Sequence, residues 1–314
     1  VIANEYLKAL EISRNTNELG GSLFRQIRRS FASGAPLQEL YDGGVIHSRL
    51  LDFMENAPYV HQSKALELTS KKRNIVIATG TGSGKTESFL MPIVDSLLKE
   101  SDAGELSPGI RAIIVYPMNA LAADQLGRFR EVMVEYPEIT FGRFVGPTKQ
   151  TNTEAVRENG EKPFQPNERP SRDEILENPP HILITNYAML ERLMLLPKWQ
   201  QMFTHKLKWI VMDEVHSYDG TKGIEISLLL RRLKVRTASS EGVQCIAASA
   251  TLGNGSKEDI LRTCKFASIL FGEKFEEGDI ILPEYSSEVA EEPLVDIFSI
   301  EERRNLEKYR HEEV

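Results

Sequence analysis

Two short stretches carry residue types that could act together on a nucleoside triphosphate. Residues 78–86 read ATGTGSGKT, and residues 211–216 read VMDEVH. The first stretch ends in Gly-Lys-Thr, as phosphate-binding loops do, but it has Thr79 where the strict loop pattern requires glycine. The second supplies adjacent carboxylates, which suit metal binding and the activation of water. The first question is therefore whether Thr79 rules out a phosphate-binding loop.

The loop residues have distinct expected roles. Gly82 and Gly84 let backbone N–H groups converge on phosphate oxygens, Lys85 reaches the β/γ-phosphates, and Thr86 ligates Mg²⁺. The alternative is a glycine-rich turn with an incidental Lys-Thr, but the apolar run before the loop and the helical pattern after it favour the phosphate loop. The predicted nucleotide-binding residues of this loop are Thr81, Gly82, Ser83, Gly84, Lys85 and Thr86.

The acidic pair completes the predicted nucleoside-triphosphate site. Asp213 and Glu214 follow an apolar run, and ligands of open α/β sheets bind at the carboxyl ends of strands. Asp213 would hold Mg²⁺ through its water shell, and Glu214 would polarise the attacking water, so Lys85, Asp213 and Glu214 form the predicted catalytic set. Taken alone, an Asp-Glu pair after a strand is more often a loop start or a helix cap.

The elements that must position these residues are short apolar runs separated by helical patterns. Runs that are apolar throughout indicate strands covered on both faces, and helices between them indicate parallel crossovers. The sequence therefore predicts an α/β fold with a doubly wound parallel sheet. The predicted strands are 74–79, 111–117, 181–186, 208–214 and 243–251, with a further short strand in IILPEY near the C-terminal end.

The chain divides into three predicted parts. Residues 1–56 have helical periodicity and form a helical extension, residues 57–272 form the ATP-binding domain, and residues 273–314 form an acidic tail. Within the domain, residues 146–180 are polar and contain many prolines, which predicts a long mobile or functional loop.

Composition narrows the class of protein. The chain is 41% hydrophobic and 27% charged, with no apolar run that could span a membrane and no secretory leader. Its cysteines are Cys245 and Cys264 alone, which argues against a disulfide framework or a zinc site and predicts a cytoplasmic location without a membrane partner. The net charge of −8 is local, because residues 273–314 hold 14 acidic and 5 basic side chains, leaving the rest near neutrality.

Three stretches in order resemble the motifs of superfamily 2 DExD/H helicases: GTGSGKT, DEVH at 213–216 and SAT at 249–251. The resemblance implies a RecA-like domain that uses ATP and Mg²⁺, and DEVH places the chain nearer the DExH branch. In many members the first loop position is Ala rather than Gly, so Thr79 is tolerable there. In this family, certain residues couple the state of the γ-phosphate to nucleic-acid binding. The resemblance assigns this coupling role to His216, Ser249 and Thr251.

Other stretches, before and between these three motifs, also resemble the family. Gln62 in PYVHQSKAL resembles the glutamine that reads adenine. YPMNALAADQ and ILITNYAML resemble motifs that touch the nucleic-acid backbone, which assigns phosphate contacts to Asn119, Thr185 and Asn186. Each of these two stretches, seen alone, could equally be a polar strand-to-helix cap. Residues 58–285 are similar to a narrower group, the large bacterial helicases of the MrfA/YprA and Lhr types, including those of the defence systems DISARM and Druantia.

The family resemblance also implies a partner domain. Superfamily 2 motors use a second RecA-like domain that supplies arginine fingers, and no such motif follows Thr251. An arginine finger contributes about 10³ to 10⁵ in rate, so the isolated chain is expected to be a weak or inactive ATPase. The acidic tail is interpreted as a linker toward that domain, or alternatively as a pseudo-substrate that occupies a basic groove.

The expected function is therefore that of the first motor domain of an ATP-dependent helicase or translocase. DNA, single-stranded or duplex, is the favoured substrate without excluding RNA, and defence-system proteins are candidate partners. The alternative is an ATP-gated module that recognises nucleic acid without unwinding it. A P-loop kinase or transporter ATPase is disfavoured, because SAT is present and an LSGGQ-type signature is not.

Overall fold

The computed structural model describes residues 30–54, 56–80, 82–160, 163–238, 242–250 and 255–286. The chain divides into two compact units, of which one runs from Phe31 to Glu284. The other comprises residues 1–30 and 285–314, where the described part is limited to Ser30, Tyr285 and Ser286; here the Ser286 N–H donates to the Ser30 carbonyl at 2.8 Å. Most of the predicted helical extension and of the acidic tail therefore lies outside the described residues.

An eight-stranded sheet forms the centre of the Phe31–Glu284 unit, and every strand pairing in it is parallel. The strand order is β4-β3-β5-β2-β6-β7-β1-β8. The order places β1 and β6, which precede the two chemical motifs, on either side of β7. The strands are β1 Ile75–Ala78, β2 Ala112–Tyr116, β3 Phe141–Phe144, β4 Glu168–Arg169, β5 Ile182–Asn186, β6 Trp209–Met212, β7 Gln244–Ser249 and β8 Ile280–Ile281.

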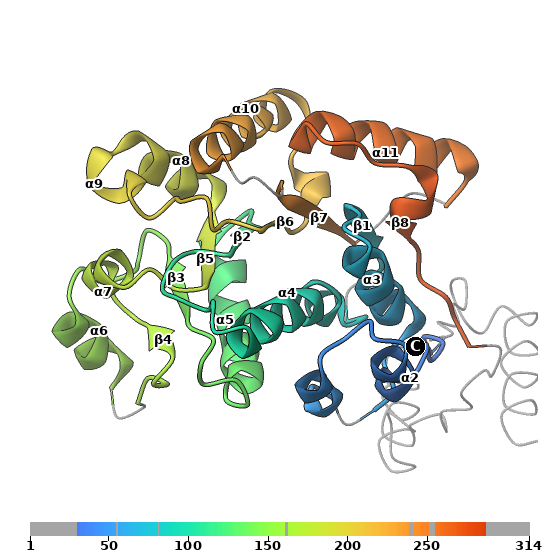
Figure 1. Cartoon of the computed structure of the whole chain (residues 1–314). Helices are drawn as coiled ribbons and strands as arrows, with labels where there is room; N and C mark the ends of the chain where they lie inside the picture. The colour runs from blue at the N-terminus through green and yellow to red at the C-terminus, as the bar shows by residue number, and fades with distance from the viewer. Residues whose placement is uncertain are drawn as a thin grey trace, which may run out of the picture. The chain divides into compact units, whose positions relative to one another are not determined.

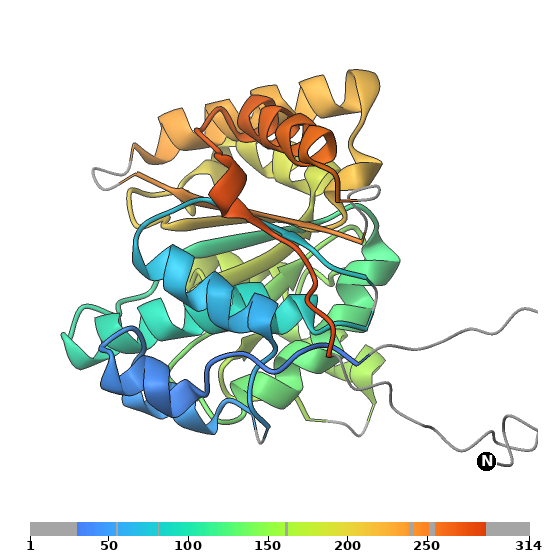
Figure 2. The ribbon, with the colours of Figure 1, turned by 90° about the vertical axis from the view of Figure 1, so that its right-hand side faces the viewer.

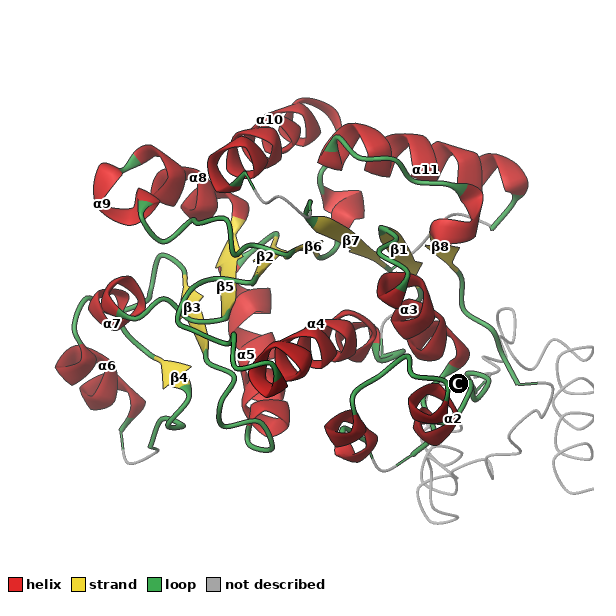
Figure 3. Cartoon of the chain, viewed as in Figure 1, coloured by secondary structure: helices red, strands yellow, loops and turns green. Residues whose placement is uncertain are grey.

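Helices cover both faces of the sheet, as Figures 1 and 2 show. One face packs against α2 Leu37–Asp42, α3 Val60–Ser70, α4 Lys85–Asp102 and α5 Asn119–Met133, and the other against α8 Tyr187–Leu195, α9 Pro197–Gln200, α10 Gly220–Thr237 and α11 Lys257–Phe271. The remaining helical segments are α6 Asn152–Asn159, α7 Arg172–Glu177, and the 3₁₀ turns η1 Ser48–Asp52, η2 Val215–Ser217 and η3 Glu277–Asp279 (Figure 3). Two apolar cores, one on each face, bury the central strands completely. The predicted doubly wound α/β fold is confirmed.

The structure corrects the prediction of a long loop at residues 146–180. This stretch instead holds α6, the edge strand β4 and α7. Thr151 and Glu154 form a capping box at the start of α6, and the Ser171 hydroxyl accepts the Glu174 N–H at the start of α7. Capped short helices of this kind satisfy their own backbone N–H groups. They therefore form within a polar sequence that lacks long apolar runs.

None of the helices in the described ranges combines the length and the apolar composition that a bilayer crossing requires. Residues 31–54 pack onto the same unit, where Leu37, Leu40, Ile46 and Leu50 are buried in the core shared with α3 and α4.

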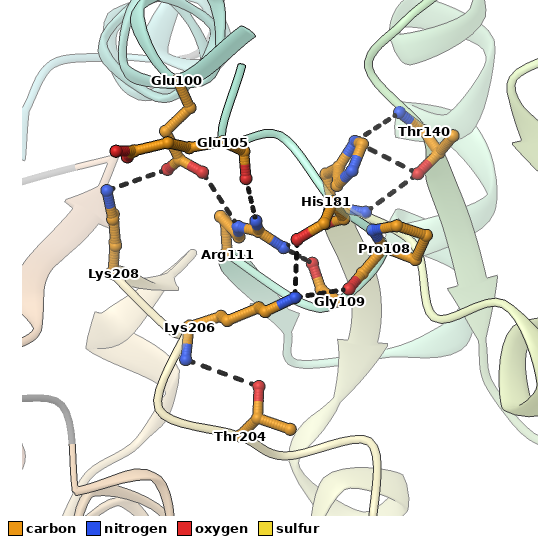
Figure 4. Close-up of polar contacts among 11 residues, drawn as sticks. Glu100, Glu105, Pro108, Gly109, Arg111, Thr140, His181, Thr204, Lys206 and Lys208 are labelled. Carbon is orange, nitrogen blue, oxygen red and sulfur yellow. Dashed lines mark hydrogen bonds and ion pairs between the residues drawn. The ribbon is translucent and has the colours of Figure 1, made fainter. Parts of the chain in front are cut away.

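A buried charged network lies where β2 begins (Figure 4). It is at the amino-terminal ends of the strands, whereas the chemical motifs follow their carboxyl-terminal ends. Arg111 is only 3% exposed, and its guanidinium donates to Glu100 Oε2 at 3.0 Å. The same guanidinium also donates to the carbonyls of Glu105, Ser107 and Gly109. Buried charge is tolerated when it is paired and hydrogen-bonded in this way.

Glu100 connects this network to a second strand. Its Oε1 lies 2.9 Å from the ammonium of Lys208, the residue immediately before β6. Burial, together with the charge of Arg111, lowers the pKa of the neighbouring His181 to about 4, so this ring is neutral near pH 7 and accepts the Thr140 N–H at 3.0 Å. Glu100 therefore fixes the end of α4 to the starts of both β2 and β6.

Candidate ATP-binding and coupling site

The phosphate-loop candidate lies between β1 and α4, as the sequence predicts. Gly82 and Gly84 have φ of +74° and +75°, a region that glycine enters without steric cost. Ser83 is fully buried, and its hydroxyl lies 2.6 Å from the Thr79 hydroxyl. The residue that departs from the strict loop pattern therefore ties the loop to the end of β1. Thr81, also predicted to bind nucleotide, lies outside the described residues.

Replacing Thr79 with Val is expected to lower the free energy of unfolding by about 1–3 kcal/mol, because the buried Ser83 hydroxyl loses its partner. Thr79→Ser keeps the hydroxyl and loses one buried methyl group, so its loss should be about 0.5–1.5 kcal/mol, at the lower end of the loss expected for the Val variant. Denaturant unfolding of the nucleotide-free chain measures both values. A loss of stability in Thr79→Ser together with none in Thr79→Val would show that the methyl group, and not the hydrogen bond, supports the loop.

Glu214 connects the acidic pair to the loop. Its Oε1 accepts from Lys85 Nζ at 3.3 Å, while its backbone N–H donates to Asp213 Oδ1 at 2.9 Å. The Glu214 backbone has φ +48° and ψ +48°, in the left-handed region that non-glycine residues seldom occupy. Such strain is of order 1–3 kcal/mol and concentrates at functional sites. The predicted catalytic residues Lys85, Asp213 and Glu214 are thus brought together.

Asp213 has an unusual electrostatic environment. Burial, and then the adjacent charge of Glu214, raises the pKa of Asp213 from its ordinary value of 3.8 to about 6, against the smaller opposing effects of the Glu214 backbone N–H and then Lys85. The folded chain therefore holds a proton that the unfolded chain releases between these two pH values. The contribution of this group to stability is fully present below pH 3.8 and is lost as the pH rises through about 6.

Asp213→Asn cannot titrate, so it should stabilise the Mg²⁺-free chain at pH 7 to 8. The expected gain in unfolding free energy is on the order of 1–3 kcal/mol, and it should disappear at or below about pH 4. Chemical unfolding of both chains across this pH range measures the difference. A gain that does not change with pH would place its origin elsewhere.

The residues present fit a Mg²⁺ ion held together with nucleotide phosphates. The Thr86 hydroxyl donates its hydrogen to Gln125 Oε1 at 2.9 Å, which leaves its lone pairs available for a metal. Near Asp213, the hydroxyls of Tyr116 and Tyr218 are buried without a hydrogen-bond partner among the described residues, and burial followed by the charge of Asp213 raises the pKa of both. Within the described ranges no cluster of three or more His, Cys, Asp or Glu forms a metal cage. Mg²⁺ ordinarily needs no such cage, because it keeps several waters and uses phosphates.

Gln62, the predicted adenine reader, lies against the phosphate loop. Its Nε2 donates to the Gly84 carbonyl at 3.2 Å, and its Oε1 accepts the Tyr59 N–H at 2.8 Å. The side chain is 1% exposed. Adenine recognition by Gln62 stays a prediction, and it would require the amide to exchange at least one of these contacts.

The coupling residues lie across β6 and β7. His216 Nδ1 is 3.3 Å from Ser249 Oγ and 3.2 Å from Glu214 Oε2. One imidazole nitrogen thus lies beside both the predicted catalytic carboxylate and the end of β7. Thr251, the third predicted coupling residue, lies outside the described residues.

The predicted nucleic-acid residues differ in their accessibility. Asn119 follows β2, and Asn186 is the last residue of the neighbouring strand β5. The Asn186 amide donates to Asn119 Oδ1 at 2.5 Å. Asn186 also caps α8 by accepting the Met189 N–H at 2.8 Å. The Thr185 hydroxyl, in contrast, is fully buried and donates to the Phe144 carbonyl at 2.7 Å. In this conformation Thr185 supports the sheet and presents no hydroxyl to a strand.

Two side chains at the site were not assigned from the sequence. Gln125 orients the Thr86 hydroxyl, and the His61 ring contacts the Ser83 carbonyl at 2.7 Å. Both lie inside stretches that resemble helicase motifs, YPMNALAADQ and PYVHQSKAL. Polar side chains in helices next to the loop indicate a role at the site. They do not show which atom each side chain contacts.

An α/β sheet with a phosphate loop after β1 and an Asp-Glu pair after β6 defines a P-loop nucleoside-triphosphate-binding domain. A family model described as DEAD/DEAH box helicase matches residues 59–260, and the chain belongs to this family.

Two relatives are much longer than this chain. The Druantia protein DruE of Escherichia coli is 31% identical, over 71% of this chain and 18% of that protein. The uncharacterised ATP-dependent helicase YprA of Bacillus subtilis is 32% identical, over 62% of this chain and 23% of that protein. The chain thus spans less than a quarter of the length of either relative.

Solved structures show the same fold. The helicase MrfA matches with a TM-score of 0.57 and 27% identity, over 77% of this chain and 33% of MrfA. The structure of MrfA bound to DNA matches with a TM-score of 0.61 and 24% identity, over 86% of this chain and 35% of that chain. These likenesses confirm the RecA-like helicase fold.

Proposed function

We propose that this chain is the first motor domain of an ATP-dependent nucleic-acid helicase or translocase. The observation that carries the proposal is the contact of Lys85 Nζ with Glu214 Oε1 at 3.3 Å, which joins the phosphate loop to the acidic pair. The same carboxylate lies beside His216, which in turn lies beside Ser249. A change at the γ-phosphate can therefore reach β7 through three side chains.

Each residue at the cleft has a role in this proposal. Lys85 and the loop N–H groups bind the phosphates, Thr86 and Asp213 hold Mg²⁺, and Glu214 positions the attacking water. Mg²⁺ would neutralise charge on the transferred phosphate group. Before ATP binds, the Lys85 ammonium contacts one carboxylate oxygen of Glu214. Phosphate binding would draw Lys85 away and free this oxygen to contact the attacking water, so the two events are coupled. Gln62, Thr81, Gly82, Ser83 and Gly84 complete the nucleotide set.

The nucleic acid is proposed to cross the carboxyl ends of β2 and β5. Asn119 and Asn186 lie there with polar side chains directed to each other, and contacts of this type position a strand without reading its sequence. Thr185 would contribute through its backbone position alone. DNA is favoured, since MrfA is a relative that has been solved with DNA. The likeness to DruE supports a role in anti-phage defence with partner proteins of such a system.

A second RecA-like domain and a cytoplasmic location belong to the same proposal. The chain by itself, without arginine fingers from that domain, is expected to hydrolyse ATP weakly. The decisive experiment compares ATP hydrolysis by the longer protein, which contains both domains, with and without single-stranded DNA, duplex DNA and RNA. A rise with nucleic acid supports the proposal, and equal rates under all conditions contradict it.

Strand displacement then separates a motor from a gated module. A helicase displaces a labelled strand in an ATP-dependent manner, and a translocase moves along DNA without displacement. Nucleotide-dependent binding with neither movement nor displacement would identify the alternative, an ATP-gated recognition module.

A further inference from the structure

A small cavity of about 180 Å³ lies at the β4 edge of the sheet, within the region predicted as a loop. It is a partly open hollow bordered by β3, β4, the second half of α5, α6 and the segment that follows β3. Among the described residues, four cations and two carboxylates line it, which gives a formal charge of +2. They are Arg130, Arg143, Lys149, Arg169, Glu158 and Glu168.

Most of these charges are compensated by one another. Arg130 donates two parallel hydrogen bonds to Glu168, each of 2.8 Å, in the bidentate geometry that fixes both planes. Lys149 lies 3.2 Å from Glu158. Arg169 lies 3.8 Å from Glu174 on α7. Both carboxylates that line the cavity are therefore already paired with a cation.

Arg143 is the exception. No hydrogen bond or ion pair of its guanidinium is found among the described residues, although the side chain is partly buried beside Arg130. Burial, and then the charge of Arg130, lowers the pKa of Arg143, while Glu168 and Glu158 act in the opposite sense. A partly buried cation that has no carboxylate partner carries a desolvation cost, and an anion in the cavity would offset part of that cost.

The size of the cavity restricts the anion. A volume of about 180 Å³ is below the range of about 300–1,000 Å³ typical of drug-sized ligands. A tetrahedral phosphate group fits such a space. Arginine matches phosphate oxygens in a bidentate manner.

We propose that this cavity binds a single phosphate group, with Arg143 as its principal ligand. The site is separate from the phosphate loop, since β5, β2, β6 and β7 lie between β3 and β1 in the sheet. The proposal does not depend on the proposed helicase function. The phosphate can be free orthophosphate or the phosphomonoester at the end of a polynucleotide, because both offer the same group.

The test measures binding of inorganic phosphate by titration calorimetry with the whole 314-residue chain. The parent for this experiment carries Lys85→Ala, which removes the contribution of the phosphate loop. Adding Arg143→Gln should weaken phosphate binding by about tenfold or more, since hydrogen bonds between charged groups are the strong ones. Adding Arg157→Gln gives the matched control, because Arg157 lies exposed on α6 and does not line the cavity. This control should bind phosphate like the parent.

Equal phosphate affinity in the Arg143→Gln and Arg157→Gln chains, or no binding by the parent, overturns the proposal. Circular dichroism shows whether each variant folds. Should Arg143→Gln fail to fold, Arg143→Lys and Lys149→Gln replace it, and phosphate binding unaffected by both would also overturn the site.

Competition distinguishes the two sources of phosphate. Oligonucleotides that end in 5′-phosphate, 3′-phosphate or hydroxyl groups are titrated into the phosphate-loaded parent. Displacement by one phosphorylated end alone supports a strand end as the natural occupant. Displacement by no oligonucleotide, with the Arg143 dependence intact, supports free orthophosphate. Equal displacement by the hydroxyl end contradicts a single-phosphate site.

Discussion

In the proposed two-domain motor, replacing Glu214 with Gln is expected to reduce the proposed nucleic-acid-stimulated ATP hydrolysis by about 10²- to 10⁴-fold, the usual contribution of a positioned acid or base. The amide cannot take a proton from water, but it keeps the size of the side chain. ATP binding should persist, because Lys85 and the loop remain and Lys85 loses a competing carboxylate at 3.3 Å. Turnover with saturating ATP measures the first effect, and binding of a fluorescent ATP analogue measures the second.

Glu225→Gln is the matched control. It removes the same charge from an exposed position on α10 and should leave turnover unchanged. Loss of ATP binding in Glu214→Gln would mean that this residue maintains the loop and does not act on water. A reduction below about threefold would exclude Glu214 as the residue that activates water.

Arg111→Met is expected to produce the largest loss of stability, about 3–5 kcal/mol in the free energy of unfolding. The variant leaves Glu100 buried with Lys208 as its remaining ion-pair partner, and removes the guanidinium that donates to the carbonyls of Ser107 and Gly109. Breaking one side of a buried pair costs more than the pair contributes, because the remaining charge stays desolvated. Denaturant unfolding of the nucleotide-free chain measures the loss.

Arg262→Met serves as the control for this experiment. Arg262 pairs with Glu258 on α11, where the two side chains are 72% and 83% exposed, and pairs of this kind contribute about 0–1 kcal/mol. Similar losses in the two variants would show that the Arg111 network is no more important than a surface ion pair.

The fold could be predicted where residue type alone determines an element. Strands β1, β2, β5, β6 and β7 are continuous apolar runs, and each was located within one or two residues of its ends. Strand β3, which reads FGRF, was missed because glycine and arginine interrupt the apolar pattern, and β4 has only two residues. The helices of residues 146–180 depend on caps, which are weak signals within a polar sequence.

The candidate site shows the same division. The positions of Lys85 and Glu214 followed from motif spacing and strand ends, and the structure brings them together. The contacts of Thr79 with Ser83 and of Gln125 with Thr86 depend on which side chains meet after folding. Thr185 illustrates the opposite case, because burial turns a residue expected at a surface into one that supports the sheet.

The ion pairs at the two ends of α4 have a consequence for how this domain can move. Lys85 at the start of α4 contacts Glu214 after β6, and Glu100 near the end of α4 contacts Lys208 before β6. Along α4, Lys85 and Glu100 are about 22 Å apart. Along the extended segment that contains β6, Lys208 and Glu214 are about 20 Å apart, so the two separations match. Sliding by one strand residue, about 3.3 Å, would break both pairs. Helix and strand are therefore held at both ends before ATP binds. When phosphate releases Glu214 from Lys85, the Glu100–Lys208 pair still anchors the opposite end, so the rearrangement is confined to the carboxyl ends of the strands.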